Sequence, residues 1–398
     1  MITTRERVTI GEVLRGGRTA WQAEVHDRLR PFVPLDSRQS VLTSQGKAAF
    51  EQLVLAANLQ DSRVLVPAFF PDDFVGVFFK YRITPVFVDV DPATYHLDLN
   101  AITDAQLVGA RALLIEHTFG LPGDGLAYRA FCERHGLVLI EDCARALGAS
   151  RAGRLVGSFG HYAMFSLPKC VPVRAGGLAL AEEPFQPHLE RAALGLSGFL
   201  HTLTLIRFPC PSVLEDLVYR TVADSSIYPL EVGNYEPLPC RDLDAVAQVM
   251  LKIFLPHYRA ALDQKRRWAM ALRRELEPLG FVFQADPTGD HIYTSVSVDP
   301  PAGCDADALK RHLLANSVKA SAMWRNAWGV SEFGRRMWHA DPDATPVARR
   351  LATRLVQLPI SRFRTPSESQ HIVELCAGFA ADRAAVACDD TALVAIRP

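Results

Sequence analysis

The sequence predicts an α/β protein in which helices cover both faces of a mostly parallel sheet, followed by a smaller α+β C-terminal domain. The first observation is that short apolar runs alternate with helical patterns in the first half of the chain, as at residues 63–71, 84–91, 111–117 and 137–142. The second is a long helical pattern that begins at residue 241, after which shorter strand and helix patterns follow. The alternation is typical of a parallel sheet, and we expect the long helix to bridge to a second domain.

Composition limits the kind of protein. With 398 residues, 49% of them apolar, the chain is long enough for two or three domains with a large core. The formal net charge of −1 predicts no nucleic-acid or anionic-membrane surface, and no apolar run approaches the roughly 20 residues of a membrane span. The eight cysteines form no C-x-x-C pair and the N-terminus has no apolar signal core. We therefore expect a cytoplasmic protein with reduced thiols and no metal site.

The pattern divides the chain into three parts. Residues 1–40 form an N-terminal arm. Residues 41–240 form the large domain, which includes an irregular apolar insert at 201–235 that we expect to contact a second subunit. Residues 241–398 contain the long linking helix and the small C-terminal domain.

A lysine and a carboxylate stand where a parallel sheet places its ligands. The apolar strand 137–140 is followed by Asp142, and a second apolar run, 161–167, leads to Lys169. Open parallel sheets bind ligands at the carboxyl ends of their strands. A lysine that can form a Schiff base, with a carboxylate that keeps a pyridinium nitrogen protonated, is the minimum equipment for chemistry on pyridoxal 5'-phosphate (PLP). Ala144 is small enough to lie flat against one face of the ring.

The alternative interpretation is that Asp142 is an ordinary acid at a strand end and Lys169 a surface lysine. If the two residues were considered in isolation, this alternative would be favoured. The chain has only seven lysines against 36 arginines, so lysine is not its usual surface residue. This composition favours a specific role for Lys169.

The residues around this pair resemble one family. The run IEDCARALGA (140–149), then GSFG (157–160), FSLPK (165–169) and the glycine pair 176–177 are similar to the DegT/StrS aminotransferases. The resemblance covers residues 40–181, and more loosely the rest of the chain. It implies the aspartate-aminotransferase fold (fold type I) with PLP as cofactor. The implied reaction moves an amino group from an amino acid, glutamate or glutamine, to a keto or aldehyde acceptor in a sugar or secondary-metabolite pathway.

The resemblance also implies roles for individual residues. Lys169 would hold the cofactor and move the proton, and Asp142 would pair with the ring nitrogen. An aromatic residue at Phe69 or Phe70, of which we take Phe70, would stack on the ring. The other implied cofactor contacts are Ala144 and Arg145, beside Asp142, and Ser166, which would bind the phosphate. Asn234 corresponds to a family residue that reaches the cofactor of the neighbouring subunit, so the resemblance implies a homodimer with shared active sites.

A second phosphate contact follows from the helical pattern at residues 42–59. The first backbone N–H groups of a helix have no intrahelical partner and form an anion site, which Gly46 allows a ligand to approach closely. Lys47 stands where the family has a threonine and would add a cation. An ordinary helix start without a ligand is the alternative.

Two other functions stay open. The same cofactor could serve an elimination, a decarboxylation or a cyclisation, or the protein could be a non-catalytic scaffold or ligand sensor. Lys47, Arg145 and Glu236 depart from the family pattern, which is why the scaffold stays open as an alternative.

The acceptor site is expected in the small domain. Three of the five tryptophans lie within residues 323–339, and Trp324 and Trp328, four positions apart, would share one face of a helical turn. With Arg325 they predict an aromatic-walled pocket for an acid or a flat ketone. The alternative is that these tryptophans only pack the segment against the large domain.

Overall fold

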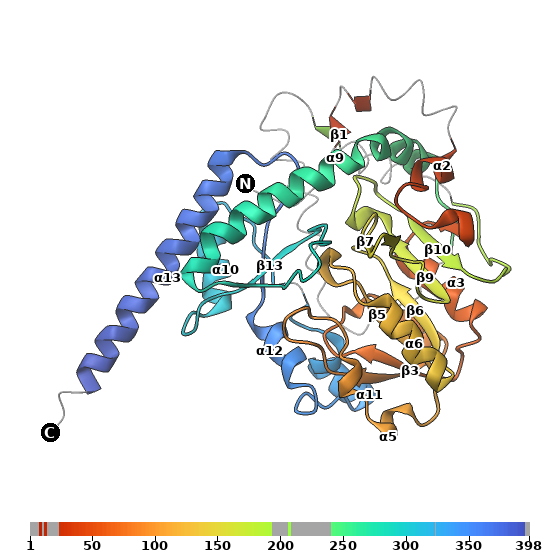
Figure 1. Ribbon diagram of the computed structural model, residues 1–398, viewed down its shortest axis with the longest axis horizontal. Helices are drawn as coiled ribbons and strands as arrows, with labels where there is room; N and C mark the ends of the chain where they lie inside the picture. The colour runs from red at the N-terminus through yellow and green to blue at the C-terminus, as the bar shows by residue number, and fades with distance from the viewer. Residues whose placement is uncertain are drawn as a thin grey trace.

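The computed structural model describes residues 8–9, 12–13, 24–192, 206–207, 240–322 and 324–394. Its centre is a seven-stranded sheet of order β2-β10-β9-β6-β5-β3-β4 (Figure 1). The five strands from β9 to β4 run parallel, and β10 runs antiparallel to both β9 and β2. This arrangement confirms the predicted fold class. The strands are β2 (Gln39–Thr43), β3 (Arg63–Pro67), β4 (Thr84–Val88), β5 (Ala110–Glu116), β6 (Val138–Asp142), β9 (Tyr162–Ser166) and β10 (Gly177–Ala181).

Helices cover both faces of this sheet, because successive side chains of a strand point to opposite faces. On one face, Ala163 and Phe165 of β9 lie in a core that α2 and α9 complete, and α6 packs on the neighbouring strands of the same sheet. On the other face, Met164 lies in a second core with α3 and α4. The helices are α2 (Val25–Leu29), α3 (Gly46–Ala56), α4 (Val75–Lys80), α6 (Gly125–His135) and α9 (Ala245–Leu276).

The chain after residue 240 begins with α9, a helix of 32 residues that continues through Pro256. The second half of α9 lies beside α13, which also lies beside α10 (Figure 1). These helices share a separate core with a three-stranded antiparallel sheet, β12-β13-β14. The predicted division of the chain near residue 240 stays a prediction. These elements are β12 (Val282–Phe283), β13 (Val296–Asp299), β14 (Val356–Leu358), α10 (Ala306–Ala315), α11 (Glu332–Trp338), α12 (Pro346–Arg354) and α13 (Pro366–Val394).

Short elements complete the described chain. Two pairs of two-residue strands lie outside the main sheets: β1 (Val8–Thr9) with β11 (Ile206–Arg207), and β7 (Ser150–Arg151) with β8 (Arg154–Leu155). Most of the predicted insert at 201–235 lies outside the described residues. The remaining helices, single turns for the most part, are α5 (Asp104–Leu107), η1 (Leu35–Ser37), η2 (Asp72–Phe74), η3 (Leu99–Ala101), η4 (Thr118–Gly120), η5 (Leu167–Lys169), η8 (Glu277–Leu279) and η9 (Trp328–Val330).

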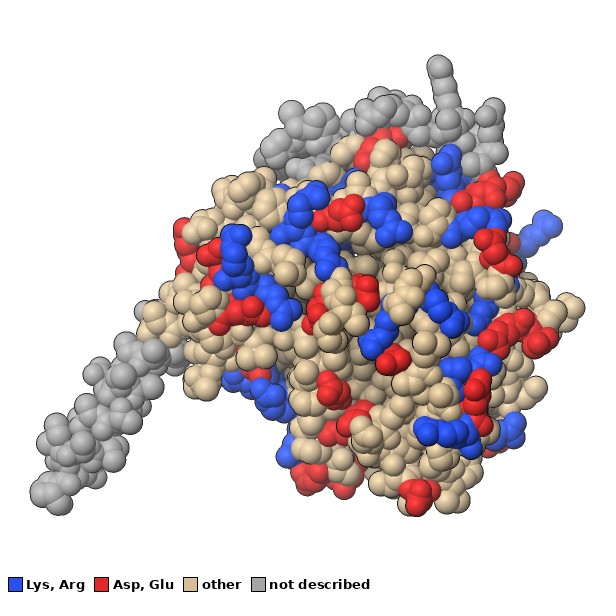
Figure 2. Space-filling view, in the orientation of Figure 1, with Lys and Arg blue, Asp and Glu red and all other residues tan. Residues whose placement is uncertain are grey.

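The surface carries charges of both signs. On the face drawn in Figure 2, acidic and basic side chains are interspersed and form no extended patch of one sign. Within the described residues, no helix combines the length and the apolar character that crossing a membrane requires.

Candidate active site

The candidate site lies where three parallel strands end. Asp142 is the last residue of β6, pairs with Glu116 of β5 on one side and with Met164 of β9 on the other, and is 1% exposed. Its Oδ1 accepts a hydrogen bond of 2.8 Å from the backbone N–H of Ala144, which fixes the carboxyl at the sheet edge. Because β9 runs parallel to β6, the chain leaves β9 at the same edge and turns through η5 to Lys169.

Lys169 faces a cavity of about 840 Å³. Its Nζ lies 2.6 Å from Asp73 Oδ2, which forms an ion pair with it. Such a cavity has the size of a cofactor or small-molecule site, which typically spans about 300–1,000 Å³. The lining residues come from the start of α3, the turn before α4, the ends of β6 and β9, and the segments around 174–176 and 241–244, namely Ser44, Gln45, Gly46, Lys47, Asp73, Phe74, Ala144, Met164, Ser166, Pro168, Lys169, Arg174, Ala175, Gly176, Ala192, Arg241 and Asp244.

The two acids nearest Lys169 have pKa values shifted in opposite directions. Burial raises the pKa of Asp142 to about 6, although the charge of Lys169 and the Ala144 N–H act against this shift. The charge of Lys169 lowers the pKa of Asp73, whose side chain is 52% exposed. Asp73, which lines the cavity, is therefore the ionised partner of the lysine, and Asp142 is a buried acid at the sheet edge that a cation could ionise.

The start of α3 forms one end of the cavity. Its N-cap residue Gln45 provides no side-chain hydrogen bond to the first turn. A Cβ on Gly46 would stand 2.8 Å from the Cβ of Ser166, so only glycine lets the helix start approach the end of β9 this closely. A Cβ on Gly177 would likewise collide with the Gln45 carbonyl, and Gly176 N–H donates to Ser44 O at 2.7 Å. The glycine pair thus brings the helix N-terminus, Lys47 and Ser166 to one place.

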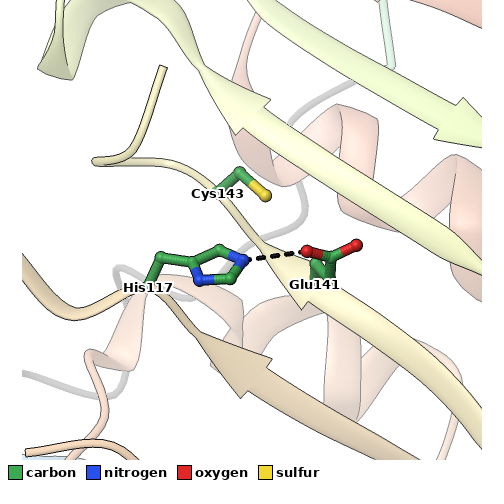
Figure 3. Close-up of side chains that lie close together, drawn as sticks. All are labelled: His117, Glu141 and Cys143. Carbon is green, nitrogen blue, oxygen red and sulfur yellow. Dashed lines mark hydrogen bonds and ion pairs between the residues drawn. The ribbon is translucent and has the colours of Figure 1, made fainter. Parts of the chain in front are cut away.

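A buried network behind Asp142 holds the sheet edge in position. Glu141 accepts hydrogen bonds from the backbone N–H groups of Gly157, Phe159 and Gly160 at 2.9, 2.8 and 2.6 Å. It also accepts one from His117 Nε2 at 2.9 Å (Figure 3). These donors keep the pKa of Glu141 below its usual value against the opposing effect of burial. The GSFG segment is therefore a loop that wraps a buried carboxylate.

His117, Glu141 and Cys143 lie close enough together to hold a metal ion, with ligand atoms within 4.8 Å of one another (Figure 3). The polar atoms already have partners, however. His117 Nδ1 accepts the Gly123 N–H at 3.0 Å, so the proton of the neutral ring is on Nε2 and points to Glu141. Burial also raises the pKa of the Cys143 thiol well above its usual value, which disfavours the thiolate that a metal needs. We interpret the cluster as a hydrogen-bonded support.

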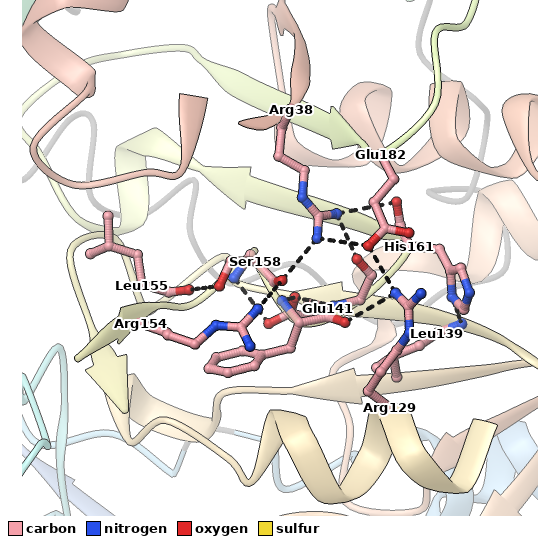
Figure 4. Close-up of polar contacts among 12 residues, drawn as sticks. Arg38, Arg129, Leu139, Glu141, Arg154, Leu155, Ser158, His161 and Glu182 are labelled. Carbon is pink, nitrogen blue, oxygen red and sulfur yellow. Dashed lines mark hydrogen bonds and ion pairs between the residues drawn. The ribbon is translucent and has the colours of Figure 1, made fainter. Parts of the chain in front are cut away.

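Arg38 clamps the same loop from the other side (Figure 4). Its side chain is 4% exposed and donates from Nη1 to Gly160 O at 2.6 Å and from Nη2 to Ser158 O at 2.9 Å. Glu182 accepts from both Arg38 and Arg129, at 3.3 and 2.9 Å. The loop behind the site is thus held by a buried guanidinium as well as by Glu141.

The structure brings together most of the predicted cofactor contacts. Gly46, Lys47, Ala144, Ser166 and Lys169 all line the cavity. Asp142 is not among the lining residues, but its carboxyl accepts the hydrogen bond of the Ala144 N–H.

Two predicted contacts, Phe70 and Arg145, do not line the cavity. Phe70 is fully buried in the core between the sheet and α4, and Phe74 lines the cavity instead. Arg145 is half-buried, with Nη1 3.5 Å from Ser295 Oγ. Asn234 lies outside the described residues.

The predicted acceptor residues do not line this cavity. Trp328 is 0% exposed and packs edge-on against Phe78, with ring centroids 4.7 Å apart. Trp324 stacks on Phe119 at 4.6 Å, and Arg325 forms an ion pair of 2.6 Å with Asp307. The two tryptophans do not share a helical turn, because Trp324 has a positive φ of 61°. This placement favours the alternative interpretation, in which they pack the segment against the large domain.

Several residues at the site escaped the sequence reasoning. Asp73 and Phe74 follow the aromatic turn after β3 and line the cavity. The pair of acids Asp72 and Asp73, just after Phe70, was the signal in the sequence that could have indicated them. Arg174 and Asp244 form an ion pair. Arg174 comes from a segment with no recognisable pattern, whereas Asp244 lies at the start of the predicted long helix, whose pattern gave no sign of a site. Glu116 was visible as an acid at the end of an apolar strand.

Comparisons with known proteins agree on one family. Residues 23–180 match the sequence model of the DegT/DnrJ/EryC1/StrS aminotransferase family. A UDP-N-acetyl-3-dehydro-alpha-D-glucosamine 3-aminotransferase of Acidithiobacillus ferrooxidans is 30% identical over 278 residues, which are 70% of this chain and 66% of that protein. An L-glutamine:2-deoxy-scyllo-inosose aminotransferase of Streptomyces kanamyceticus is 38% identical over 102 residues, 25% of this chain and 24% of that protein.

The chain thus spans less than two thirds of the length of either relative. A Streptococcus pneumoniae protein solved in its PLP form has the same fold, with a TM-score of 0.71 and 15% identity over 96% of this chain and 99% of that one.

Proposed function

The chain belongs to the DegT/DnrJ/EryC1/StrS aminotransferase family, and on that premise we propose that it is a PLP-dependent aminotransferase in which Lys169 holds the cofactor. The observation that carries the proposal is the position of the Lys169 amine, in a cavity of about 840 Å³ that Ala144 also lines, while the buried carboxyl of Asp142 accepts the Ala144 N–H at 2.8 Å.

The residues of the cavity fit the parts of PLP. The Lys169 amine suits the aldehyde carbon. The buried carboxyl of Asp142 suits a protonated ring nitrogen, because a neighbouring cation restores the ionised form that burial disfavours. The uncapped start of α3, with Lys47 and Ser166, suits the phosphate. When bound, PLP supplies an electron sink for the carbon that gains or loses the amino group.

The protein's own groups would handle binding and protons. Lys169 Nζ would carry the proton to and from the substrate carbon, since it is the nitrogen base that lines the cavity next to Asp73. Asp73 would stabilise the ammonium form of Lys169 whenever its amine is free of the cofactor. The core aromatic Phe74 and the methyl group of Ala144 would limit water around the reacting atoms.

For the substrates, we propose glutamine or glutamate as the amino donor and a keto-sugar or keto-cyclitol as the acceptor. The two relatives support this choice, because their names specify a dehydro-sugar nucleotide and an inosose with L-glutamine. The cavity supports an acceptor with a phosphate group, since Lys47, Arg174 and Arg241 all line it.

We further propose a cytoplasmic homodimer with shared active sites. The proposal of a shared site rests on the family and on the segment around Asn234. The cytoplasm suits the cysteines within the described residues, because each of these is a free thiol.

The first experiment locates the cofactor. After incubation with PLP and reduction with borohydride, peptide mapping should find the pyridoxyl label on Lys169 and none after Lys169→Ala. Lys310→Ala, which removes a lysine on α10, is the matched control and should label like wild type. Label on another lysine, or no label, would refute the assignment.

The second experiment tests the reaction. The PLP-loaded protein should release 2-oxoglutarate from glutamate, or the corresponding oxo acid from glutamine, without an acceptor present. Elimination or decarboxylation would instead release ammonia or carbon dioxide. A protein that binds PLP and releases none of these would be a scaffold.

A further inference from the structure

The end of β5 carries a buried acid that the proposed function does not use. Glu116 is 4% exposed, and the parallel register of β5 and β6 places it opposite Asp142. Residues opposite each other on neighbouring parallel strands point to the same face of the sheet, and the strands are roughly 5 Å apart. Two carboxyl groups therefore stand side by side at the sheet edge next to Lys169.

One oxygen of Glu116 lacks a partner. Its Oε2 is buried and makes no hydrogen bond, whereas Asp142 next to it accepts the Ala144 N–H and Glu141 accepts four donors. A buried polar atom of this kind is unfavourable unless a ligand satisfies it. Glu116 does not itself line the cavity, but it is an unsatisfied acid beside Asp142, whose carboxyl is held by the Ala144 N–H.

Charged groups from four segments act on Glu116. Asp142 at the end of β6 and Asp73 before α4 oppose its ionisation, while Lys169 after β9 and Arg145 after β6 favour it. Burial has the largest effect, and together these raise the pKa of Glu116 well above its ordinary value. A protonated carboxyl can donate a hydrogen bond, which an ionised one cannot.

We propose that Glu116 is a neutral hydrogen-bond donor for the cofactor, positioned beside Asp142. This inference rests on the proposed PLP function. Lys169 is assigned to the aldehyde, Asp142 to the ring nitrogen and the start of α3 to the phosphate, so the phenolic oxygen is the acceptor left for Glu116. A carboxylic acid kept neutral by its surroundings can serve as such a donor.

The first test uses the full-length protein without cofactor. Glu116→Gln keeps the shape of the side chain but cannot ionise. A raised pKa means that folding retains a proton which the unfolded chain releases, so wild type loses stability as pH rises above the ordinary Glu value of about 4.3. The stability of Glu116→Gln relative to wild type, measured by thermal unfolding, should therefore increase steadily with pH.

Glu133→Gln, at an exposed glutamate on α6, is the control and should show no such increase. If Glu116→Gln also shows none, Glu116 is ionised in the folded protein and the proposal is wrong.

The second test measures PLP affinity and the pH titration of the visible absorption of bound PLP. Glu116→Leu removes the donor and should weaken the affinity about tenfold and shift the titration. Glu116→Gln keeps an N–H donor and should stay within about threefold of wild type. Unchanged affinity and titration in Glu116→Leu would overturn the proposal.

The two levels of inference fail separately. If wild type binds no PLP, or borohydride labels no lysine, the proposed function itself is wrong. If wild type binds PLP through Lys169 and Glu116→Leu is unaltered, only the role of Glu116 is wrong. The unfolding experiment does not depend on PLP and remains informative if Glu116→Leu fails to fold.

Discussion

Lys169 Nζ and Asp73 Oδ2, 2.6 Å apart, join two segments that are far apart in the sequence, the turn after β9 and the turn before α4. The pair bridges the cavity at the point where the proposed chemistry takes place. The two residues belong to different elements. Asp73 lies just before α4, which packs on one face of the sheet, and Lys169 lies in η5, which follows the end of β9. The pair therefore links the site's key amine to the position of α4.

Asp73→Asn should destabilise the cofactor-free protein modestly at neutral pH. The pKa of Asp73 is depressed in the folded state, so its contribution is present above the ordinary Asp value near 3.9 and is lost as pH falls below it. Since the side chain is half exposed, we expect about 0.2–1 kcal/mol. Chemical unfolding at pH 7 and at pH 3 measures this, and an equal loss at both would argue against the ion pair.

Asp142→Asn should keep PLP bound while turnover falls by several powers of ten, each about 1.4 kcal/mol of transition-state stabilisation. The amide retains the shape of the carboxyl but cannot pair as an anion with the ring nitrogen. Steady-state rates and bound PLP, measured on the same sample, separate the two effects. Near-normal turnover would show that another acid serves the ring.

Asp142→Asn should also change how stability depends on pH in the cofactor-free protein. The folded pKa of about 6 lies above the ordinary Asp value, so Asp142 supports folding fully below pH 4 and loses that contribution as pH rises to 6. Relative to wild type, the variant should gain up to about 3 kcal/mol over this range. Thermal unfolding from pH 4 to 7 tests the trend, and a flat difference would contradict the raised pKa.

Arg38→Ala should destabilise the protein by about 2–4 kcal/mol, because it leaves the carbonyl groups of Ser158 and Gly160 without their charged donor. Arg30→Ala is the control: Arg30 is half exposed and pairs with the exposed acids Asp27 and Asp36, so we expect a change within about 0.5 kcal/mol. Urea unfolding of both variants provides the comparison, and similar values would mean that the clamp is unimportant.

Trp328→Ala should act through stability and not through acceptor recognition. Removing this fully buried ring leaves a cavity among Phe78 and Phe87 and should cost about 3–5 kcal/mol. We expect both half-reactions to fall in proportion to the folded fraction. A selective loss of acceptor affinity, with normal unfolding, would restore the aromatic-pocket hypothesis.

Much of the sheet was predictable, because its strands are short apolar runs separated by helical patterns and turn residues. The apolar run 137–140, for example, was predicted as a strand, and β6 (Val138–Asp142) contains all of it but Leu137 and ends in Asp142 at the expected edge. Lys169 and the glycine pair were recognisable for a similar reason. Lys169 directly follows an apolar run, and glycine is the residue that a close approach of two backbones requires.

The rest depended on contacts between distant segments. Nothing local distinguishes Phe74, which lines the cavity, from Phe70, which packs in the core, because both follow the same strand and differ only in the turn of η2. The spacing of Trp324 and Trp328 suggested one helical face, but Trp324 has a left-handed backbone and the two rings enter different cores. Likewise, the pairing of Glu116 with Asp142 requires the strand order, which periodicity does not provide.

The antiparallel insertion of β10 between β9 and β2 has a consequence for folding kinetics. Gly177 pairs with Thr43 on one side and with Ser166 on the other, so we expect the start of α3 and the turn that carries Lys169 to be held together once β10 is in place. Pairing β10 with β2 closes a loop of more than 100 residues. The entropy cost of closing such a loop slows this step of folding. A nascent chain that ends before β10 should therefore form the parallel strands without capturing PLP, and cofactor uptake should report the last strand to join the sheet.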